Sequence, residues 1–385
     1  MQPIYLDNAA STRVADDVLA LATEIQRTAW GNPSAQHPQG ALARAHIATA
    51  RDRVLVALGD KSIGAGGSAP AGDIVWTSGC SEANALAVLG AARARPGKLV
   101  ITTFEHPAIS TLADRLAADG REVVCVPPEA DGVIDPDRIA EAARDAAVIS
   151  FVAVQNEIGV VQPVAALVAA VRRVAPNAHV HVDAAQALGK IALDVAAGFD
   201  SLSIAGHKLH GPKGVGALWL RGGARIEPLW VGGGQQHGLR GGTQDAPSAA
   251  GLGLAAERAV LALTSARARW LEFAGRVMAA LEARGVRARQ LVPDHRRSPH
   301  ILAIAIAGVP ASALRNVLSS RGVYVSTGSA CADADHKKSH VLEAIGLPPD
   351  DGMVRLSFGL DTTPGDVEAA SAILADVASS LAKRS

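Results

Sequence analysis

A lysine in a glycine-rich turn and an aspartate at the end of an apolar run are the residues of this sequence best suited to chemistry. Lys208 lies in Gly206-His-Lys208 and is followed by Gly211-Pro-Lys-Gly214, whose glycines allow a close approach of the backbone. Upstream, Asp183 stands within His181-Val-Asp-Ala-Ala-Gln186. A lysine that forms a Schiff base and an acid that keeps a pyridinium nitrogen protonated are the minimum equipment of a pyridoxal-phosphate (PLP) enzyme.

Both residues also have plainer interpretations. Asp183 could cap the helix that follows it, and Lys208 could be a solvated lysine of a loop. An unpaired carboxylate after a buried strand would be costly, so a cationic ring nitrogen is a natural partner for Asp183. The glycine pattern around Lys208 favours the chemical interpretation for that residue as well.

The segment Thr77-Ser-Gly-Cys-Ser-Glu82 lies between a predicted strand and an alanine-rich predicted helix. Free amides at a helix N-terminus, together with the helix dipole, favour a phosphate at that position. Ser81 would equally serve as a plain helix cap, so this motif alone leaves both interpretations open.

A histidine and a cysteine complete the set of candidate residues. His106 follows a predicted strand in Thr103-Phe-Glu-His-Pro107, a context that also suits a loop or core histidine. Cys331 ends a strand and a run of small residues, Val323-Tyr-Val-Ser-Thr-Gly-Ser-Ala-Cys331, and predicts an exposed, mobile thiol. The basic and acidic residues that follow it act in opposite directions on its ionisation, which stays undecided. We expect Cys80 and Cys125 in or near the core.

These residues require a scaffold in which strands and helices alternate. We predict seven strands, at 74–76, 98–102, 122–126, 147–152, 179–182, 201–204 and 215–220. We predict helices between them, at 81–95, 110–119, 136–144 and 164–174. Such alternation indicates a largely parallel sheet covered on both faces, with ligands beyond the carboxyl ends of its strands.

The remainder of the chain has a different pattern. A long alanine-rich helical run is predicted from Gly251 to about Arg284, and a Gly/Ala-rich surface loop at 60–72. The C-terminal part predicts a second, smaller α/β unit, with strands at 300–307, 323–326 and 353–357 and helices at 311–321, 339–344 and from Pro364.

Composition limits the classes of protein that fit. Of 385 residues 49% are hydrophobic and 19% charged, which favours a large core over disorder. Basic and acidic residues number 37 each and aromatic residues make up 3%, so no nucleic-acid or membrane partner is indicated. Three scattered cysteines do not predict a disulfide framework or a metal site, and a reduced, cytoplasmic setting is expected.

The ordered motifs of the chain resemble those of cysteine desulfurases of the NifS/IscS type, within the class V aminotransferases and fold-type I PLP enzymes. The resemblance extends over nearly the whole chain. It is carried by Tyr5-Leu-Asp-Asn-Ala-Ala10, Gly31-Asn-Pro-Ser34, Thr77-Ser-Gly79, Glu105-His106, Gln155-Asn-Glu-Ile-Gly-Val160, His181-Val-Asp-Ala-Ala-Gln186, Gly206-His-Lys208, Gly211-Pro-Lys-Gly214, Arg240-Gly-Gly-Thr243, Gly328-Ser-Ala-Cys331 and Arg355.

The resemblance implies a fold and a role for each matching residue. It implies a large PLP-binding domain at 14–256 with a mainly parallel seven-stranded sheet. It also implies a smaller α/β domain at 1–13 and 257–385 that carries a cysteine loop at about 326–338. By this resemblance Lys208 bears PLP and moves the Cα proton, Asp183 binds the ring nitrogen, Gln186 binds the ring hydroxyl, and His106 stacks on the ring and transfers protons. The cofactor phosphate is held by Gly79, Cys80, Ser81 and His207, and in the partner subunit of a homodimer it is reached by Thr243. Arg355 binds the substrate carboxylate, and Asn156 and Asn32 position substrate and cofactor.

The reaction implied is the conversion of L-cysteine to L-alanine, with the sulfur taken as a persulfide on Cys331. An acceptor protein would then receive it for Fe–S cluster or other sulfur-compound biosynthesis. Three features depart from the usual pattern: Ala205 replaces a serine, which removes a phosphate contact of about 1 kcal/mol, the 60–72 loop is long, and the chain ends soon after its last predicted helix.

Other functions stay open at this point. A selenocysteine lyase would use the same residues. A class V aminotransferase would leave Cys331 without a purpose, and a PLP-fold binding protein would not need Lys208 and Asp183. A dinucleotide-binding role for Gly211–Gly216 does not fit, because that segment precedes a predicted strand and opens no helix.

Overall fold

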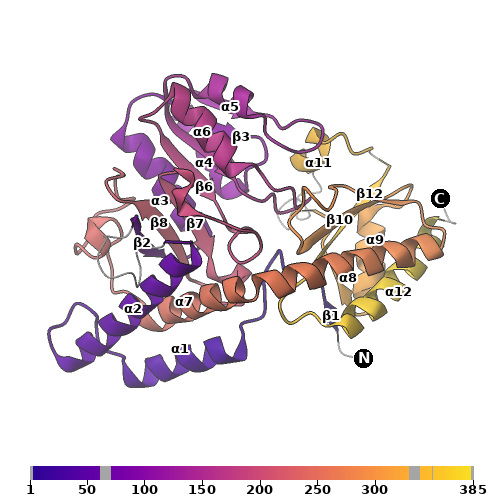
Figure 1. Ribbon diagram of the computed structural model, residues 1–385, viewed down its shortest axis with the longest axis horizontal. Coiled ribbons are helices and arrows are strands. Elements are labelled where there is room, and N and C mark those ends of the chain that lie inside the picture. Colours follow the sequence, from indigo (N-terminus) through magenta and orange to yellow (C-terminus); the bar gives the residue numbers. More distant parts are fainter. Residues whose placement is uncertain (1–2, 61–70, 329–338, 349, 383–385) are drawn as a thin grey trace.

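A seven-stranded sheet forms the centre of the larger part of the molecule in the computed structural model, which describes residues 3–60, 71–328, 339–348 and 350–382 (Figure 1). Its strands lie in the order β2-β8-β7-β6-β5-β3-β4; β8 runs antiparallel to both of its neighbours, and all pairs from β7 to β4 are parallel. The strands are β2 (Gly72–Thr77), β3 (Lys98–Thr102), β4 (Val123–Val126), β5 (Ala146–Val152), β6 (His179–Asp183), β7 (Ser201–Ala205) and β8 (Gly216–Arg221).

Helices cover both faces of this sheet because its strands carry apolar side chains on both sides. Leu99 and Ile101 of β3 face the cluster that includes α3 (Cys80–Ala94) and α4 (Pro107–Ala118), while Val100 faces the other side. That opposite side is covered by α2 (Pro38–Ala57), α5 (Pro136–Ala143), α6 (Val164–Val174) and α7 (Ala246–Leu261), with α1 (Asp16–Thr28) packed on α7. Continuous apolar strands of this kind are typical of parallel sheets that are buried on both faces.

Local signals fix the start of several helices. Asp135 precedes α5, its carboxylate accepts the amide of Asp137, and Pro136 occupies the first helical position. His106 and Pro107 do the same for α4, with the ring of His106 accepting the amide of Ala108. Proline suits this first position because its missing N–H would have no partner there.

A second group of elements builds the smaller part of the molecule, where both ends of the chain lie (Figure 1). Its antiparallel sheet has the order β12-β10-β9, and a short parallel pair joins β1 to β11. The elements are β1 (Ile4–Tyr5), α8 (Leu263–Ala283), β9 (Ala288–Gln290), β10 (Ile301–Ile306), α9 (Ala311–Ser320), β11 (Val323–Tyr324), α11 (His340–Ala344), β12 (Gly352–Ser357) and α12 (Pro364–Ala382). A separate cluster of buried side chains, with Trp270, Phe273 and Phe358 at its centre, holds them together.

The predicted fold class is confirmed: an α/β protein with a mainly parallel seven-stranded sheet and a smaller α/β unit. The predicted single helical run after Gly251 is wrong, because the chain bends by 68° between α7 and α8. The bend lets α7 pack on α1 and α2 in one core while α8 packs on α12 in the other. The expectation that Cys125 lies in or near the core is also wrong, because β4 is an edge strand and Cys125 is exposed.

Within the described part of the chain, no single helix is both long and apolar enough to cross a membrane. Only the bent pair of α7 and α8 passes such a test, when the two helices are taken together.

Two glycines in the middle of helices should respond to alanine in opposite directions. A Cβ at Gly253 in α7 would lie 2.8 Å from Ala50 Cα and 2.9 Å from Ala50 O in α2, so Gly253→Ala should destabilise the fold by about 1–3 kcal/mol. Gly275 in α8 has no atom within 4 Å of such a Cβ, so Gly275→Ala should stabilise it by about 0.5–1 kcal/mol. Denaturant unfolding of both variants measures the two changes, and equal signs would contradict the packing described.

Candidate active site

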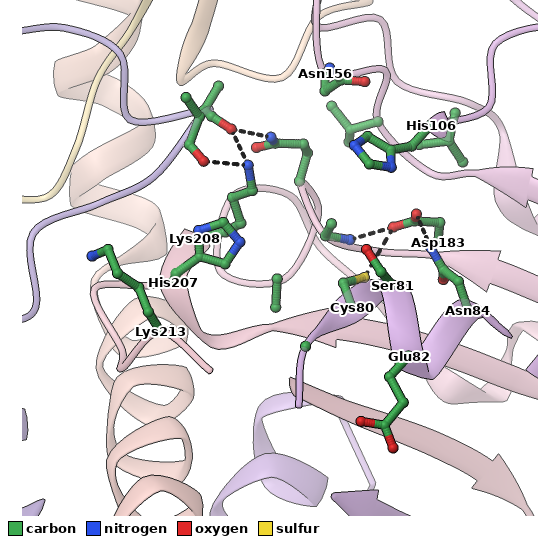
Figure 2. Close-up of a pocket in the computed structure, with 18 of the residues that line it drawn as sticks. Cys80, Ser81, Glu82, Asn84, His106, Asn156, Asp183, His207, Lys208 and Lys213 are labelled. Atoms are coloured by element: carbon green, nitrogen blue, oxygen red, sulfur yellow. Dashed lines mark hydrogen bonds between the residues drawn. The ribbon is translucent and has the colours of Figure 1, made fainter. Parts of the chain in front are cut away.

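A cavity of about 530 Å³ opens at the carboxyl ends of the parallel strands (Figure 2). Lys208 enters it from the turn after β7, Asp183 from the end of β6, and His106 from the segment after β3. The N-terminus of α3 forms a further wall. The residues that line the cavity include Ala9, Ala10, Gly79, Cys80, Ser81, Glu82, Asn84, His106, Asn156, Asp183, Gln186, Ala205, His207, Lys208, Lys213 and Arg355.

The amine of Lys208 is held by backbone carbonyls of the N-terminal segment. Its Nζ donates to the carbonyl oxygens of Ala9 at 2.5 Å and Ala10 at 2.7 Å. Burial, assisted by the cation of Arg355, lowers the pKa of Lys208 to about 8. The buried Lys190 donates to the carbonyl oxygen of Lys208 at 2.9 Å and so fixes the turn that carries the amine.

The carboxylate of Asp183 lies across the cavity from Lys208 and is 3% exposed (Figure 2). Its Oδ2 accepts from Asn84 Nδ2 at 2.7 Å, and its Oδ1 accepts from the amide of Ala185 at 2.9 Å. The thiol of Cys80 lies 3.7 Å from Oδ1 and donates to it, and burial raises the pKa of Cys80 well above its usual value. The plainer expectation that Asp183 caps a helix is wrong, because a turn follows β6; the carboxylate accepts an amide of that turn and also faces the cavity.

The start of α3 lines the cavity and has no side-chain cap. Gly79, the residue before the helix, makes no side-chain cap, and a Cβ on it would meet no atom within 4 Å. Behind it the backbone is tight, because a Cβ on Gly216 would lie 2.5 Å from the carbonyl carbon of Gly79. Ser81 and His207 lie close to this open space (Figure 2).

His106 presents a neutral ring to the cavity. Its Nδ1 accepts the amide of Ala108 at 3.1 Å, which leaves the proton of the neutral ring on Nε2. Burial lowers the pKa of His106, with Lys208 acting in the same direction and Asp183 opposing it. The preceding residue, Glu105, is fully enclosed, and burial raises its pKa to about 8.

Arg355 is a buried cation on β12 that reaches the cavity from the smaller unit. Its Nη2 forms an ion pair with Asp7 at 2.6 Å, and its Nη1 donates to the carbonyl oxygen of Asn156 at 2.7 Å. Its Nε has no hydrogen-bond partner among the described residues. An arginine held in this way retains donors for a small carboxylate.

Gln186 is fixed from both units. Its Nε2 donates to the carbonyl oxygen of Ala9 at 2.7 Å, while His300 lies 3.2 Å from its Oε1. Burial lowers the pKa of His300 well below its usual value, so the ring is neutral. Ser298 contacts the other ring nitrogen at 2.7 Å, and the side chain of Gln186 is thereby oriented.

Three predicted site residues are not among those brought together in the cavity. Asn32 and Thr243 are exposed and do not line it, and Asn32 instead accepts the amide of Ser34. Cys331 and most of the predicted cysteine loop lie outside the described residues.

Sequence reasoning missed several residues that support the cavity. Asn84 is a buried amide within an alanine-rich helix, and a polar residue in such a helix could have indicated a position that faces the site. Lys190 ends the turn that follows β6, and His300 precedes a fully apolar strand. Asp7 was noted only as part of a motif, although it forms an ion pair with Arg355.

The fold and the cavity, with a half-buried lysine facing a buried aspartate, define a fold-type I PLP enzyme. The model of the family described as aminotransferase class-V matches residues 4–370, and the chain belongs to that family. A cysteine desulfurase IscS from Dictyoglomus turgidum is 35% identical over 371 residues, which cover 94% of this chain and 91% of the relative.

Solved structures show the same similarity. A NifS-like protein superposes with a TM-score of 0.89 at 32% identity and covers 99% of this chain and 100% of its own. A structure described as SspA in complex with cysteine has a TM-score of 0.78 at 31% identity, covering 92% of this chain and 98% of its own.

The residues present fit PLP, the cofactor of this family. The cavity has the volume of a small-ligand site, and it combines an amine, a carboxylate and the uncapped N-terminus of α3. Lys208, Asp183 and Ser81 could hold the aldehyde, ring-nitrogen and phosphate ends respectively.

The lowered pKa of Lys208 predicts how fast the apo-protein captures PLP. The neutral amine is the reacting form, so the rate should rise with pH and level off above about pH 8, not near the ordinary lysine value of 10.5. Growth of the visible absorbance band after mixing measures this rate. Arg355→Met should move the profile to higher pH, because it removes a cation that lowers the pKa. A profile that still rises like that of a solvated lysine would contradict the assignment.

Proposed function

We infer that this protein is a PLP-dependent cysteine desulfurase, which converts L-cysteine to L-alanine and transfers the sulfur. The inference is supported by membership of the class V aminotransferase family and by similarity to a cysteine desulfurase over most of both chains. The observation that carries it is the cavity itself, in which Lys208, Asp183 and Arg355 converge. A similar protein solved with cysteine supports the choice of substrate.

The cofactor supplies an electron sink for the electrons released at the Cα of the amino acid. We propose that Asp183 binds its ring nitrogen, Gln186 its ring hydroxyl, and Gly79, Cys80, Ser81 and His207 its phosphate. Asn156 and His106 line the cavity, and we assign them to positioning the substrate and covering the ring.

Proton movement is assigned to Lys208 and His106. With a pKa of about 8, Lys208 is partly neutral near neutral pH, so its Nζ can take the Cα proton of the bound substrate. The neutral ring of His106, with its proton on Nε2, can exchange a proton with the substrate sulfur. Both groups are half-buried in the cavity, which limits their contact with solvent.

The substrate carboxylate is assigned to Arg355. The guanidinium is buried and already aligned by Asp7 and Asn156, so little orientation is lost when a carboxylate binds. Asn32 does not line the cavity of its own chain. Its predicted role in positioning the substrate would therefore require it to reach a cavity from outside, as proposed below for Thr243 of the partner subunit.

Sulfur transfer is assigned to Cys331. Its thiolate attacks the substrate sulfur, a sulfur–sulfur bond forms, and the carbon–sulfur bond of the substrate breaks with its electron pair passing to the carbon fragment. Protonation of that fragment yields alanine, and the enzyme keeps a persulfide on Cys331. An acceptor protein then takes the sulfur for Fe–S cluster or other sulfur-compound biosynthesis.

Assembly and location are also part of the proposal. A homodimer would allow the exposed Thr243 to reach the cofactor phosphate of the partner subunit. The division into 14–256 and 1–13 with 257–385 is supported in outline by two clusters of buried side chains, of which the larger extends to Ala259 near the end of α7. A cytoplasmic location is proposed because a persulfide on Cys331 requires a reduced thiol. Selenocysteine lyase activity is the alternative on the same residues.

Replacement of Cys331 tests the sulfur-transfer step. Cys331→Ala should abolish alanine and sulfide release from L-cysteine with dithiothreitol while the visible PLP band remains. Cys125→Ala is the matched control, because this exposed thiol lies on the edge strand β4 and should leave both products unchanged. Full activity of the Cys331 variant would instead favour a lyase or an aminotransferase, and amino transfer to a keto acid would identify the latter.

Replacement of Arg355 tests substrate binding. Arg355→Lys keeps a cation but loses the planar pair of donors, so KM for L-cysteine should rise about ten- to a hundredfold, equivalent to about 1.5–3 kcal/mol. The PLP band should be retained, since Arg355 is assigned to the substrate. A fall in kcat at unchanged KM would argue against this role.

A further inference from the structure

A row of hydrogen-bonded polar side chains extends from Asp183 away from the cavity and into the central sheet. Asn84 Oδ1 lies 3.0 Å from His181 Nε2, and His181 Nδ1 lies 2.8 Å from Ser201 Oγ. The same hydroxyl lies 2.8 Å from His179 Nε2. Each of these side chains is at most 1% exposed, so water does not compete for the bonds.

The chemistry of the first member sets the direction of every bond in the row. The carboxylate of Asp183 accepts, so the amide nitrogen of Asn84 must face it and the amide oxygen must face His181. That oxygen can only accept, so His181 carries a proton on Nε2.

The remaining bonds follow from the neutrality of both imidazoles. Burial lowers the pKa of His181 and of His179 to about 3. The bare Nδ1 of His181 therefore accepts the only proton of the Ser201 hydroxyl, whose oxygen then accepts from His179 Nε2. His179 Nδ1 has no partner among the described residues and ends the row.

We propose that His179, Ser201, His181 and Asn84 form a one-directional donor relay that positions Asp183 for the cofactor ring nitrogen, an inference that rests on the proposed PLP-dependent function. All four bonds point toward the carboxylate. Bonds aligned in one direction polarise each other, so the last donor, Asn84 Nδ2, is strengthened by those behind it. The four are positioning residues, because only Asn84 reaches the cavity.

The relay explains why polar residues occupy positions 181 and 201, where apolar side chains would pack equally well. His181 and Ser201 are neighbours on β6 and β7, and both side chains are fully buried in the sheet. Burying a polar side chain is costly unless it is hydrogen-bonded, and these four side chains are bonded to one another in a single row, which points to a function for the aligned bonds.

The neighbouring strand provides a matched control. Ser150 of β5 lies beside His181 on the side opposite Ser201, and it is equally buried. Its hydroxyl has no hydrogen-bond partner among the described residues. Ser150→Ala and Ser201→Ala therefore remove the same atom on either side of one histidine, but only the second interrupts the relay.

The test is a PLP titration of the apo-proteins, followed by a pH titration of the visible band, both without cysteine. In Ser201→Ala the dissociation constant of PLP should rise about tenfold and the pH at which the band changes should shift, while Ser150→Ala should match the wild type. Ser201→Thr restores the hydroxyl and should restore both values. Thermal unfolding of the apo-proteins checks that each variant folds.

Asn84→Leu interrupts the relay at a second position and can be used if Ser201→Ala does not fold. Leucine is similar in size to asparagine and is compatible with the helix α3 that carries residue 84. It should change both readouts in the same direction and more strongly, because it removes the bond to Asp183 itself. Equal dissociation constants and equal pH profiles for an interrupted variant and Ser150→Ala would overturn the relay.

The outcomes also separate the relay from the proposed function. A wild-type protein that binds PLP but releases no alanine from L-cysteine would overturn the desulfurase proposal, while a difference between Ser201→Ala and Ser150→Ala would still support the relay. A wild-type protein that fails to bind PLP would overturn both.

Discussion

The structure depends on holding the amine of Lys208 and the carboxylate of Asp183 in one cavity without forming an ion pair between them. Lys208 is held by two backbone carbonyls, and Asp183 receives donors from Asn84, Ala185 and Cys80. An ion pair between the two would satisfy both charges and remove the reactive amine. Because each group has its own partners, the space between them stays available for a ligand that can contact both.

This separation explains why the N-terminal segment belongs to the site. Ala9 and Ala10 provide carbonyls to Lys208, Ala9 also orients Gln186, and Asp7 orients Arg355. The segment is anchored in the smaller unit, where β1 pairs with β11. The N-terminal segment therefore connects the two hydrophobic cores and brings residues that are remote in sequence to one cavity. The site forms only when both cores are assembled.

The sequence was most informative where local chemistry decides the structure. Strands, helix starts and the cavity residues at strand ends followed from apolar runs, caps and glycines, as for Lys208 and Asp183. The bend between α7 and α8 could not be predicted, because Ala262 is an ordinary helix former and the bend arises from packing on two cores. The partners Asn84, Lys190 and His300 were missed for a related reason: which buried polar group meets which is decided by sheet order and register, not by local sequence.

The pairing of β12 with the chain after β11 links substrate binding to sulfur transfer in the proposed reaction. Ser326 exchanges two backbone hydrogen bonds with Arg355, the residue assigned to the substrate carboxylate. Cys331 follows Ser326 by five residues, and a chain of that length reaches at most roughly 18 Å. The segment that carries the proposed acceptor thiol is therefore tethered beside the residue that would hold the substrate. The pairing of Ser326 with Arg355 thus sets both the position of the bound substrate and the point from which the segment that carries Cys331 extends.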